Sequence, residues 1–189
     1  MLSDKVKELI EKSRIVSFDW QYPSTVIEIF QQADNERRFL TDEEIDKIKT
    51  ITPGLSENLA QGKALRDNVN DIVSNARKVV LDTYPHLTEP GGGLYPPMRA
   101  EACWRDFWHF MRCISYGVSG QALNYTSEIG LGYMEQLYRE LQVPLNAMVL
   151  GLEQLKVFSL QQFESSQQLE PYFDRLIESM AKFSMASNN

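Results

Sequence analysis

The chain has 189 residues, of which 43% are hydrophobic and 24% charged, and its net charge is -7 at pH 7. This length suits one domain with a substantial core. The acidic balance and the lack of a Lys/Arg cluster argue against nucleic-acid binding. No apolar run approaches the roughly 20 residues of a membrane-spanning helix, and the charged N-terminal residues lack the apolar core of a signal peptide. Two cysteines make no disulfide framework, which favours a reducing, cytoplasm-like compartment.

Residues 1–23 are predicted to form an N-terminal helical extension ahead of a single domain at residues 24–189. Ser3 is a candidate N-cap, and Val6, Leu9 and Ile10 form a short apolar stripe after it. Such a segment could dock as an amphipathic arm or remain a solvated extension. The residues themselves leave both alternatives open.

Apolar residues recur at helical spacing through the rest of the chain. One helix is expected from Ser24 towards Arg38, and another follows a capping box that begins at Thr41. Further helices are predicted at about residues 65–83, 97–120, 128–141, 145–163 and from 170 onward. Strand-like alternation and fixed-period repeats are missing from the sequence. The predicted fold class is therefore all-α, with about seven or eight helices.

The stretch between Tyr95 and Gly120 contains both cysteines and two of the three tryptophans. An apolar stripe predicts one long helix here, formed by Cys103, Phe107, Phe110, Met111, Ile114 and Val118. Asp106 follows Cys103 by three residues, so both side chains should project from one face, about a turn apart. The two cysteines would lie about 15 Å apart along the helix, which is beyond disulfide reach. A helix face of this kind is usually core packing, but it could also hold a flat ligand.

The familiar catalytic and metal-binding patterns do not occur. Cys103 and His109 would lie about 240° apart around a helix, so they cannot pair locally as nucleophile and base. The spacing of the histidines and cysteines matches no usual zinc site. The glycines at positions 91–93 lack the Lys-Ser/Thr of a phosphate-binding loop. We therefore expect no enzyme, and His109 as an axial haem ligand is kept as a minor alternative.

A linear tetrapyrrole, or bilin, suits the stretch better. It requires a thiol for a thioether bond, a carboxylate for its pyrrole N–H groups and guanidinium groups for its propionates. Aromatic walls would keep its rings flat and dry. The residues that could meet these needs are Cys103, Asp106, Arg105, Arg99 or Arg112, Trp104, Phe107 and Trp108.

A family pattern occupies the same region. It consists of Pro90-Gly-Gly-Gly-Leu-Tyr95, Ala102-Cys103-Trp-Arg105-Asp106, Arg112 and Tyr116-Gly117. This pattern resembles the phycobiliproteins, and within them the α-type subunits of allophycocyanin. The likeness extends from about Ser24 to Met180 and includes Arg38-Phe39-Leu40 and Pro171-Tyr-Phe-Asp174.

The resemblance implies a globin-like bundle, an N-terminal helical hairpin used for dimerisation, and one phycocyanobilin-type chromophore per chain. It also implies that Cys103 forms the thioether, that Asp106 contacts the pyrrole N–H groups and that Arg105 binds a propionate. The other predicted chromophore contacts are Tyr95, Trp104, Trp108, His109, Tyr116 and Tyr138.

An antenna role in light harvesting follows from the same resemblance. It places the protein in the phycobilisome, on the cytoplasmic face of the thylakoid membrane. The expected partners are a β-type allophycocyanin subunit, further copies in a ring or helical assembly, and linker proteins. A chromophore-free scaffold or adapter of the antenna is the alternative function.

Several residues depart from the family pattern, among them Gly93, Pro96-Pro97, Trp104, Trp108 and His109. Bulky rings and a stiff Pro-Pro segment could press the bilin towards coplanarity and move its absorption to the red or far-red. The protein would then pass excitation energy towards chlorophyll. In the other interpretation, the two tryptophans merely face the β-type partner and the colour is ordinary.

Overall fold

The computed structural model describes residues 2–164 and 166–186, and its regular elements there are nine α-helices and three short 3-10 helices. The α-helices are α1 (Asp4–Lys12), α2 (Ser24–Asn35), α3 (Asp42–Ile51), α4 (Ser56–Asp67), α5 (Val69–Thr83), α6 (Pro97–Ser119), α7 (Glu128–Glu140), α8 (Leu145–Leu160) and α9 (Glu170–Ala186). The 3-10 helices are η1 (Pro53–Leu55), η2 (Pro85–Thr88) and η3 (Gln167–Leu169). The predicted all-α fold is confirmed. Within the described ranges, no helix is both long and apolar enough to cross a membrane.

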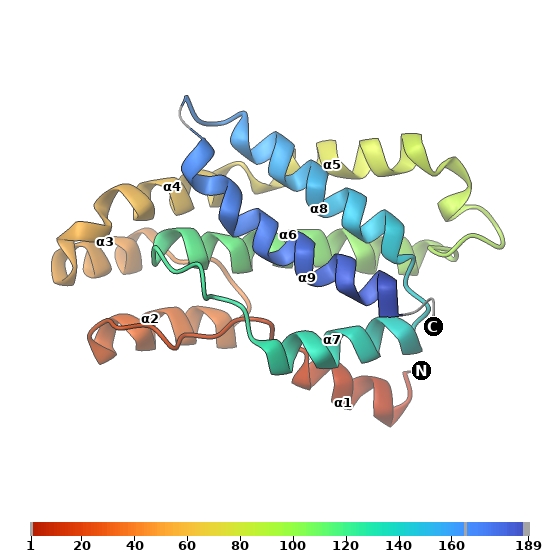
Figure 1. Ribbon diagram of the computed structural model, residues 1–189, viewed down its shortest axis with the longest axis horizontal. Coiled ribbons are helices and arrows are strands. Elements are labelled where there is room, and N and C mark those ends of the chain that lie inside the picture. Colours follow the sequence, from red (N-terminus) through yellow and green to blue (C-terminus); the bar gives the residue numbers. More distant parts are fainter. Residues whose placement is uncertain (1, 165, 187–189) are drawn as a thin grey trace.

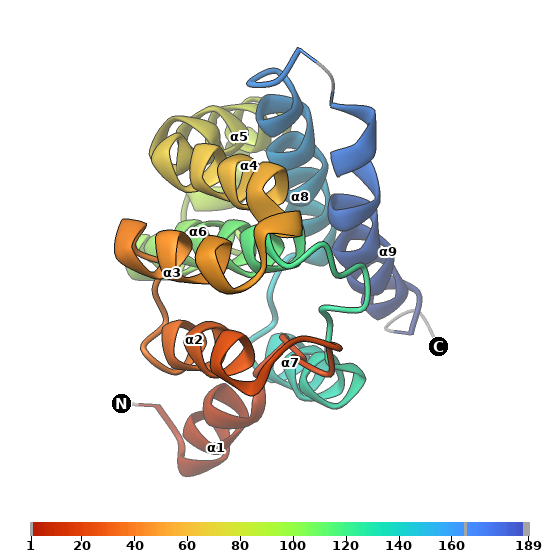
Figure 2. The same cartoon turned by 90° about the vertical axis from the view of Figure 1, so that its left-hand side faces the viewer.

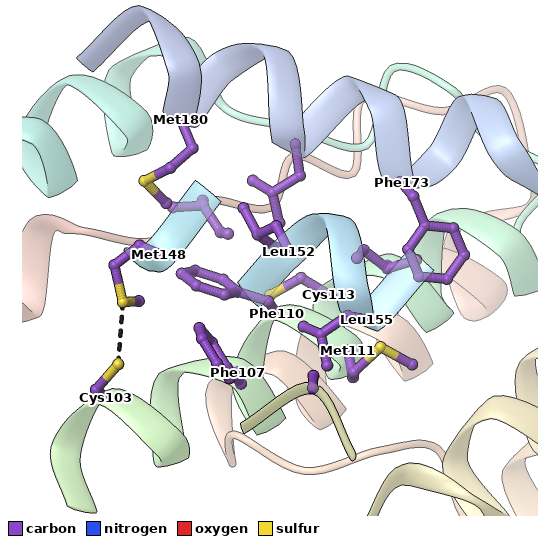
Figure 3. Packing of buried hydrophobic residues seen from close by; sticks show 14 of the residues in the cluster. Cys103, Phe107, Phe110, Met111, Cys113, Met148, Leu152, Leu155, Phe173 and Met180 are labelled. Carbon is purple, nitrogen blue, oxygen red and sulfur yellow. Dashed lines mark hydrogen bonds between the residues drawn. The ribbon is translucent and has the colours of Figure 1, made fainter. Parts of the chain in front are cut away.

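Helix α6 forms the centre of the molecule. It lies beneath α5 and α8 with α9 beside it, while α1, α2 and α7 form a layer on its other side (Figures 1 and 2). Pro97 occupies its first turn, where the missing N–H would have had no partner within the helix. The predicted apolar stripe of α6 is buried. Phe107 packs against α8 at Gly151, where any side chain would overlap the Phe107 ring (Figure 3).

Helices α2 and α3 form the expected N-terminal hairpin, and a second cluster of buried residues joins this hairpin to α4 and α6. Phe30 of α2 and Tyr116 of α6 are fully buried in that cluster, with their ring centroids 6.1 Å apart. Phe18 and Trp20 pack against Phe30 from the N-terminal side. The hairpin therefore buries its apolar face against its own chain. Its use in dimerisation stays a prediction, which now requires another face.

Helix α4 is missing from the sequence-based prediction, which began this region at Leu65. The structure places Leu65 on α4 and starts α5 at Val69, with Asn68 between the two helices. Helix α4 has few large apolar residues because it approaches α6 closely through Gly62, where an added Cβ would overlap the side chain of Ser119. A helix that packs through small residues leaves a weak apolar stripe, so its periodicity went unrecognised.

The N-terminal arm, residues 2–22, docks on the bundle. Ser3 caps α1 as predicted, accepting a hydrogen bond from the Val6 N–H at 3.2 Å, and Val6 and Leu9 are buried. Lys5 pairs with Glu140 of α7 at 2.5 Å. After α1, the Ile15 carbonyl accepts a hydrogen bond of 2.7 Å from the N–H of residue 127. Of the two alternatives for this segment, the structure supports docking.

The predicted division into an extension at 1–23 and a domain at 24–189 stays a prediction. Its outer limits, Met1 and Asn189, lie outside the described residues.

Two glycines of α7 test how closely the arm is packed. A Cβ at Gly130 would overlap the backbone carbonyl of Arg14, whereas a Cβ at Gly132 would meet nothing within 4 Å. We expect Gly130→Ala to lower the free energy of unfolding by roughly 1–3 kcal/mol. Gly132→Ala should raise it by up to about 1 kcal/mol, because alanine favours helix.

Urea denaturation measures both changes, and limited proteolysis reports whether the arm has been released. Equal effects of the two substitutions would contradict the observed docking of the arm.

Candidate chromophore site

A cavity of about 610 Å³ lies between α6, α7, the end of α2 and the N-terminal arm. Its volume falls within the range of about 300–1,000 Å³ that is common for small-molecule sites. The lining from α6 includes Met98, Arg99, Cys103, Arg105, Asp106, His109, Phe110, Arg112 and Cys113. The lining from α7 and the segment after it includes Met134, Leu137, Tyr138, Leu141 and Val143. The cavity thus combines an apolar wall with a row of polar and charged groups.

Cys103 lies on the buried face of α6 and borders the cavity. Its Sγ atom is 3.0 Å from the Sδ atom of Met148 on α8 (Figure 3). Burial, together with the nearby carboxylate of Asp106, raises the pKa of the Cys103 thiol well above its ordinary value. The thiol is therefore neutral at physiological pH, and it forms no disulfide with Cys113.

Asp106 shares the cavity with Cys103, as their spacing predicted. The Tyr138 hydroxyl donates a hydrogen bond of 2.9 Å to Asp106 Oδ2. Burial raises the pKa of Asp106 to about 6, although this hydrogen bond and Arg105 act in the opposite direction. A buried carboxylate whose pKa is raised in this way is stabilised when a ligand supplies N–H donors or a positive charge.

Five arginines line the cavity, against three acidic residues. The arginines are Arg14, Arg37, Arg99, Arg105 and Arg112, and the acids are Asp34, Glu101 and Asp106. This local excess of positive charge stands out in a chain whose net charge is -7. The planar guanidinium group pairs well with carboxylates, so the lining suits a ligand that carries carboxylate groups.

Arg37 is placed at the cavity by an uncommon backbone conformation. Its φ angle is 55°, in the left-handed region that costs a residue other than glycine roughly 1–2 kcal/mol. The turn ends α2, because the N–H of Arg38 bonds the Ala33 carbonyl at 3.0 Å. Glycine is the usual residue in such a turn. An arginine there brings a positive charge to the cavity, at a cost in local strain.

His109 lies within this positive field. Arg112 Nε approaches its Nδ1 atom at 3.3 Å. Burial lowers the pKa of His109 to about 4, and the positive charges of Arg112, Arg37 and Arg105 add to this effect. The imidazole is therefore neutral at physiological pH. Among the described residues, no group of three or more His, Cys, Asp or Glu side chains could hold a metal ion.

Four of the nine predicted contact residues lie away from the cavity. Trp104 packs towards α5, where the Arg77 guanidinium lies 5.2 Å from its ring centroid. Trp108 meets Phe39 edge-on at 4.9 Å. Tyr116 is buried in the second cluster, and Tyr95 is 45% exposed.

The geometry of the α-helix explains why the two tryptophans lie away from the cavity, since each residue advances about 100° around the helix axis. The side chains at positions 104 and 108 therefore point away from the helix face that carries Cys103 and Asp106. The five predicted residues that do line the cavity are Cys103, Arg105, Asp106, His109 and Tyr138.

The sequence-based reading missed the contribution of the N-terminal arm to the cavity lining. The arm supplies Leu2, Ile10, Ser13, Arg14 and Ile15. The apolar stripe of α1 was visible in the sequence, but nothing there indicated which surface it covers. Arg37 was missed as well, because a left-handed backbone at an arginine has no recognisable sequence signal.

Comparisons with known proteins agree on one family. The model of the phycobilisome protein family matches residues 28–180. The allophycocyanin α-B chain of Cyanophora paradoxa is 29% identical over 160 residues, which is 84% of this chain and 99% of that protein. The α-B chain of Cyanidium caldarium is 30% identical over 154 residues, or 80% and 94%. The allophycocyanin α chain of Galdieria sulphuraria is 30% identical over 159 residues, or 83% and 99%.

The raised pKa of Asp106 predicts a stability change that depends on pH. The unfolded carboxyl ionises near its ordinary pKa and the folded one only near pH 6, so stability falls as pH rises through this window. We expect Asp106→Asn to stabilise the bilin-free protein at pH 7.5 by roughly 1–2 kcal/mol, after allowance for partial exposure. The gain should largely vanish at pH 4.

Urea denaturation at both pH values measures the effect. Glu101→Gln is a matched control, because it removes the same charge from an exposed position of α6. A loss of stability in Asp106→Asn at pH 7.5 would contradict the raised pKa of Asp106.

Proposed function

Since the chain belongs to the phycobilisome protein family, as an allophycocyanin α-type phycobiliprotein, we propose that it carries one phycocyanobilin-type bilin in the cavity beside α6. Phycobiliproteins are light-harvesting pigment-binding proteins and not enzymes. The observation that carries the proposal is the meeting of the Cys103 thiol, the Asp106 carboxyl and five arginines in one cavity. The bilin, when bound, supplies the conjugated system that absorbs light.

Cys103 is the proposed attachment point. Its S–H adds across a carbon–carbon double bond of the bilin: sulfur bonds one carbon and a hydrogen is placed on the other. The addition is balanced and requires no oxidant. The neutral state of the buried thiol makes this reaction slow without help, because the thiolate is the nucleophile. Attachment therefore depends on a base, or on a local opening that exposes Cys103 to water.

The remaining roles follow from charge and placement. Asp106, oriented by the Tyr138 hydroxyl, accepts hydrogen bonds from the pyrrole N–H groups. Arg105 is exposed beside the cavity and binds a propionate, and Arg37 adds a second positive charge. His109 stays neutral and offers ring nitrogens without adding charge. These contacts would hold the bilin at both its polar edge and its centre.

The proposed setting is the phycobilisome on the cytoplasmic face of the thylakoid membrane. There the chain pairs with a β-type allophycocyanin subunit, and the pairs assemble into rings or helices with linker proteins. A chromophore-free scaffold of the antenna remains the alternative function. The polar lining of the cavity favours the pigmented role, because Arg37 and Arg105 add positive charge there beyond the arginines that pair with Asp34.

Far-red absorption is a finer proposal within this function, with energy passed towards chlorophyll. The placement of Trp104 and Trp108 outside the cavity removes the argument from bulky rings. The argument from the Pro96-Pro97 segment stands, because Met98 directly after it and Leu94, two residues before it, line the cavity. A stiff segment at this position would restrict rotation of a terminal bilin ring.

Covalent attachment is tested with two cysteine variants. The chain is produced together with phycocyanobilin, and covalent bilin is detected by zinc-enhanced fluorescence in denaturing gels. We expect Cys103→Ala to abolish the signal and Cys113→Ala to retain it, although both residues border the cavity. If only Cys113→Ala lost the signal, the attachment point would be Cys113 and not Cys103. A wild-type chain that shows no fluorescence in the gel, and no absorption of visible light in its native state, would favour the scaffold.

Far-red tuning is tested by the absorption spectrum of the chain assembled with bilin and a β-type partner. We expect a maximum to the red of standard allophycocyanin, and a shift to shorter wavelength when Pro96 and Pro97 are both replaced by alanine. Trp108→Phe serves as the control and should leave the maximum unchanged, because Trp108 packs on Phe39. A wild-type maximum no redder than standard allophycocyanin contradicts this proposal.

A further inference from the structure

The N-terminal arm closes one side of the cavity. Five of its residues border the cavity, from Leu2 through Ile10 to Ile15. Figure 2 shows α1 beneath α2 and α7, with these two helices between α1 and the main body of the bundle. The arm also precedes residue 28, where the match to the phycobilisome family model begins. The chain therefore adds a wall to the cavity from outside the family region.

Backbone contacts hold this wall in place. Ile15 and Ser17 flank an isolated β-bridge between Val16 and Thr126. The Ser17 N–H bonds the Tyr125 carbonyl at 2.7 Å, and the Ile15 carbonyl accepts a second bond of 2.7 Å from the N–H of residue 127. Gly130 lets the Arg14 backbone lie directly against α7. Because paired backbone groups are costly to separate in a buried place, the arm is an ordered part of the cavity.

Arg14 connects the wall to the charged end of the cavity. Its guanidinium lies 3.0 Å from Asp34 Oδ2 and 2.9 Å from Asn35 Oδ1. The other oxygen of Asp34 pairs with Arg112 at 2.6 Å. One buried carboxylate thus binds an arginine of the arm and an arginine of α6. Docking of the arm and the position of Arg112 are coupled through it.

We propose that the N-terminal arm is a structural wall of the bilin site, which excludes water from the chromophore and restricts its rotation. Ile10 and Ile15 supply the apolar contact, and Arg14 orders the polar end through Asp34. The proposal rests on the proposed function, because it assigns the arm to the same bilin cavity. A bilin without this wall would meet solvent along one side and bind more weakly.

The test measures the dissociation constant of phycocyanobilin in a Cys103→Ala background, where binding is non-covalent. Ile10→Asn places a polar amide on the wall, and deletion of residues 2–12 removes α1 and with it Leu2 and Ile10. We expect each to weaken phycocyanobilin binding about tenfold, from the loss of apolar burial. The matched control is Glu11→Asn, which alters the exposed neighbouring position and should leave the dissociation constant unchanged.

Hydrogen exchange provides a second measurement on the same proteins. Phycocyanobilin should slow exchange at the α1 amides of the intact chain, which a purely structural arm would not show. If the deleted chain does not fold, the comparison of Ile10→Asn with Glu11→Asn decides the question.

The outcomes separate the two proposals. Failure of the intact chain to bind phycocyanobilin overturns the proposed function, and this inference with it. Binding of equal strength in the intact chain and in Ile10→Asn, with α1 exchange unchanged by phycocyanobilin, overturns the wall alone and leaves the antenna function in place.

Discussion

A buried ion pair joins Asp34, near the end of α2, to Arg112 in the middle of α6, with 2.6 Å between Oδ1 and Nη1. The two side chains are only 9% and 8% exposed. Removing one partner of such a pair typically costs about 3–5 kcal/mol, because the other is left charged and unpaired. Arg112 also donates to the Tyr116 hydroxyl at 3.0 Å, so the pair reaches into the second core cluster. The hairpin, the central helix and the cavity all depend on this contact.

The same pair sets the electrostatics of the cavity. With Asp34 occupied by Arg14 and Arg112, the remaining arginines face a buried carboxyl group, Asp106, and a neutral imidazole, His109. Burial raises the pKa of Asp106 to about 6, while burial and nearby arginines lower that of His109 to about 4. Positive charge is therefore concentrated at the cavity without a matching set of protein carboxylates. A ligand with two propionates and several pyrrole N–H groups would complement both features.

Local patterns predicted the elements whose signals are strong. The stripe of α6, the capping box at Thr41 and the shared face of Cys103 and Asp106 all reappear in the structure. Helix α4 was missed because close approach to α6 selects small residues such as Gly62 rather than a broad apolar stripe. Trp104 and Trp108 were assigned to the bilin by residue type, but the turn of the helix directs them elsewhere.

By itself the sequence determined the all-α fold, the central helix and the placement of a thiol and a carboxyl on one face, since these depend on residues a few positions apart. Only the tertiary structure decided that the N-terminal arm docks on α7 and borders the cavity. Lys5 and Glu140 are 135 residues apart, and no local pattern indicates which of several apolar faces α1 covers. Packing between distant segments depends on the shape of the whole bundle, so it is settled only when the chain has folded.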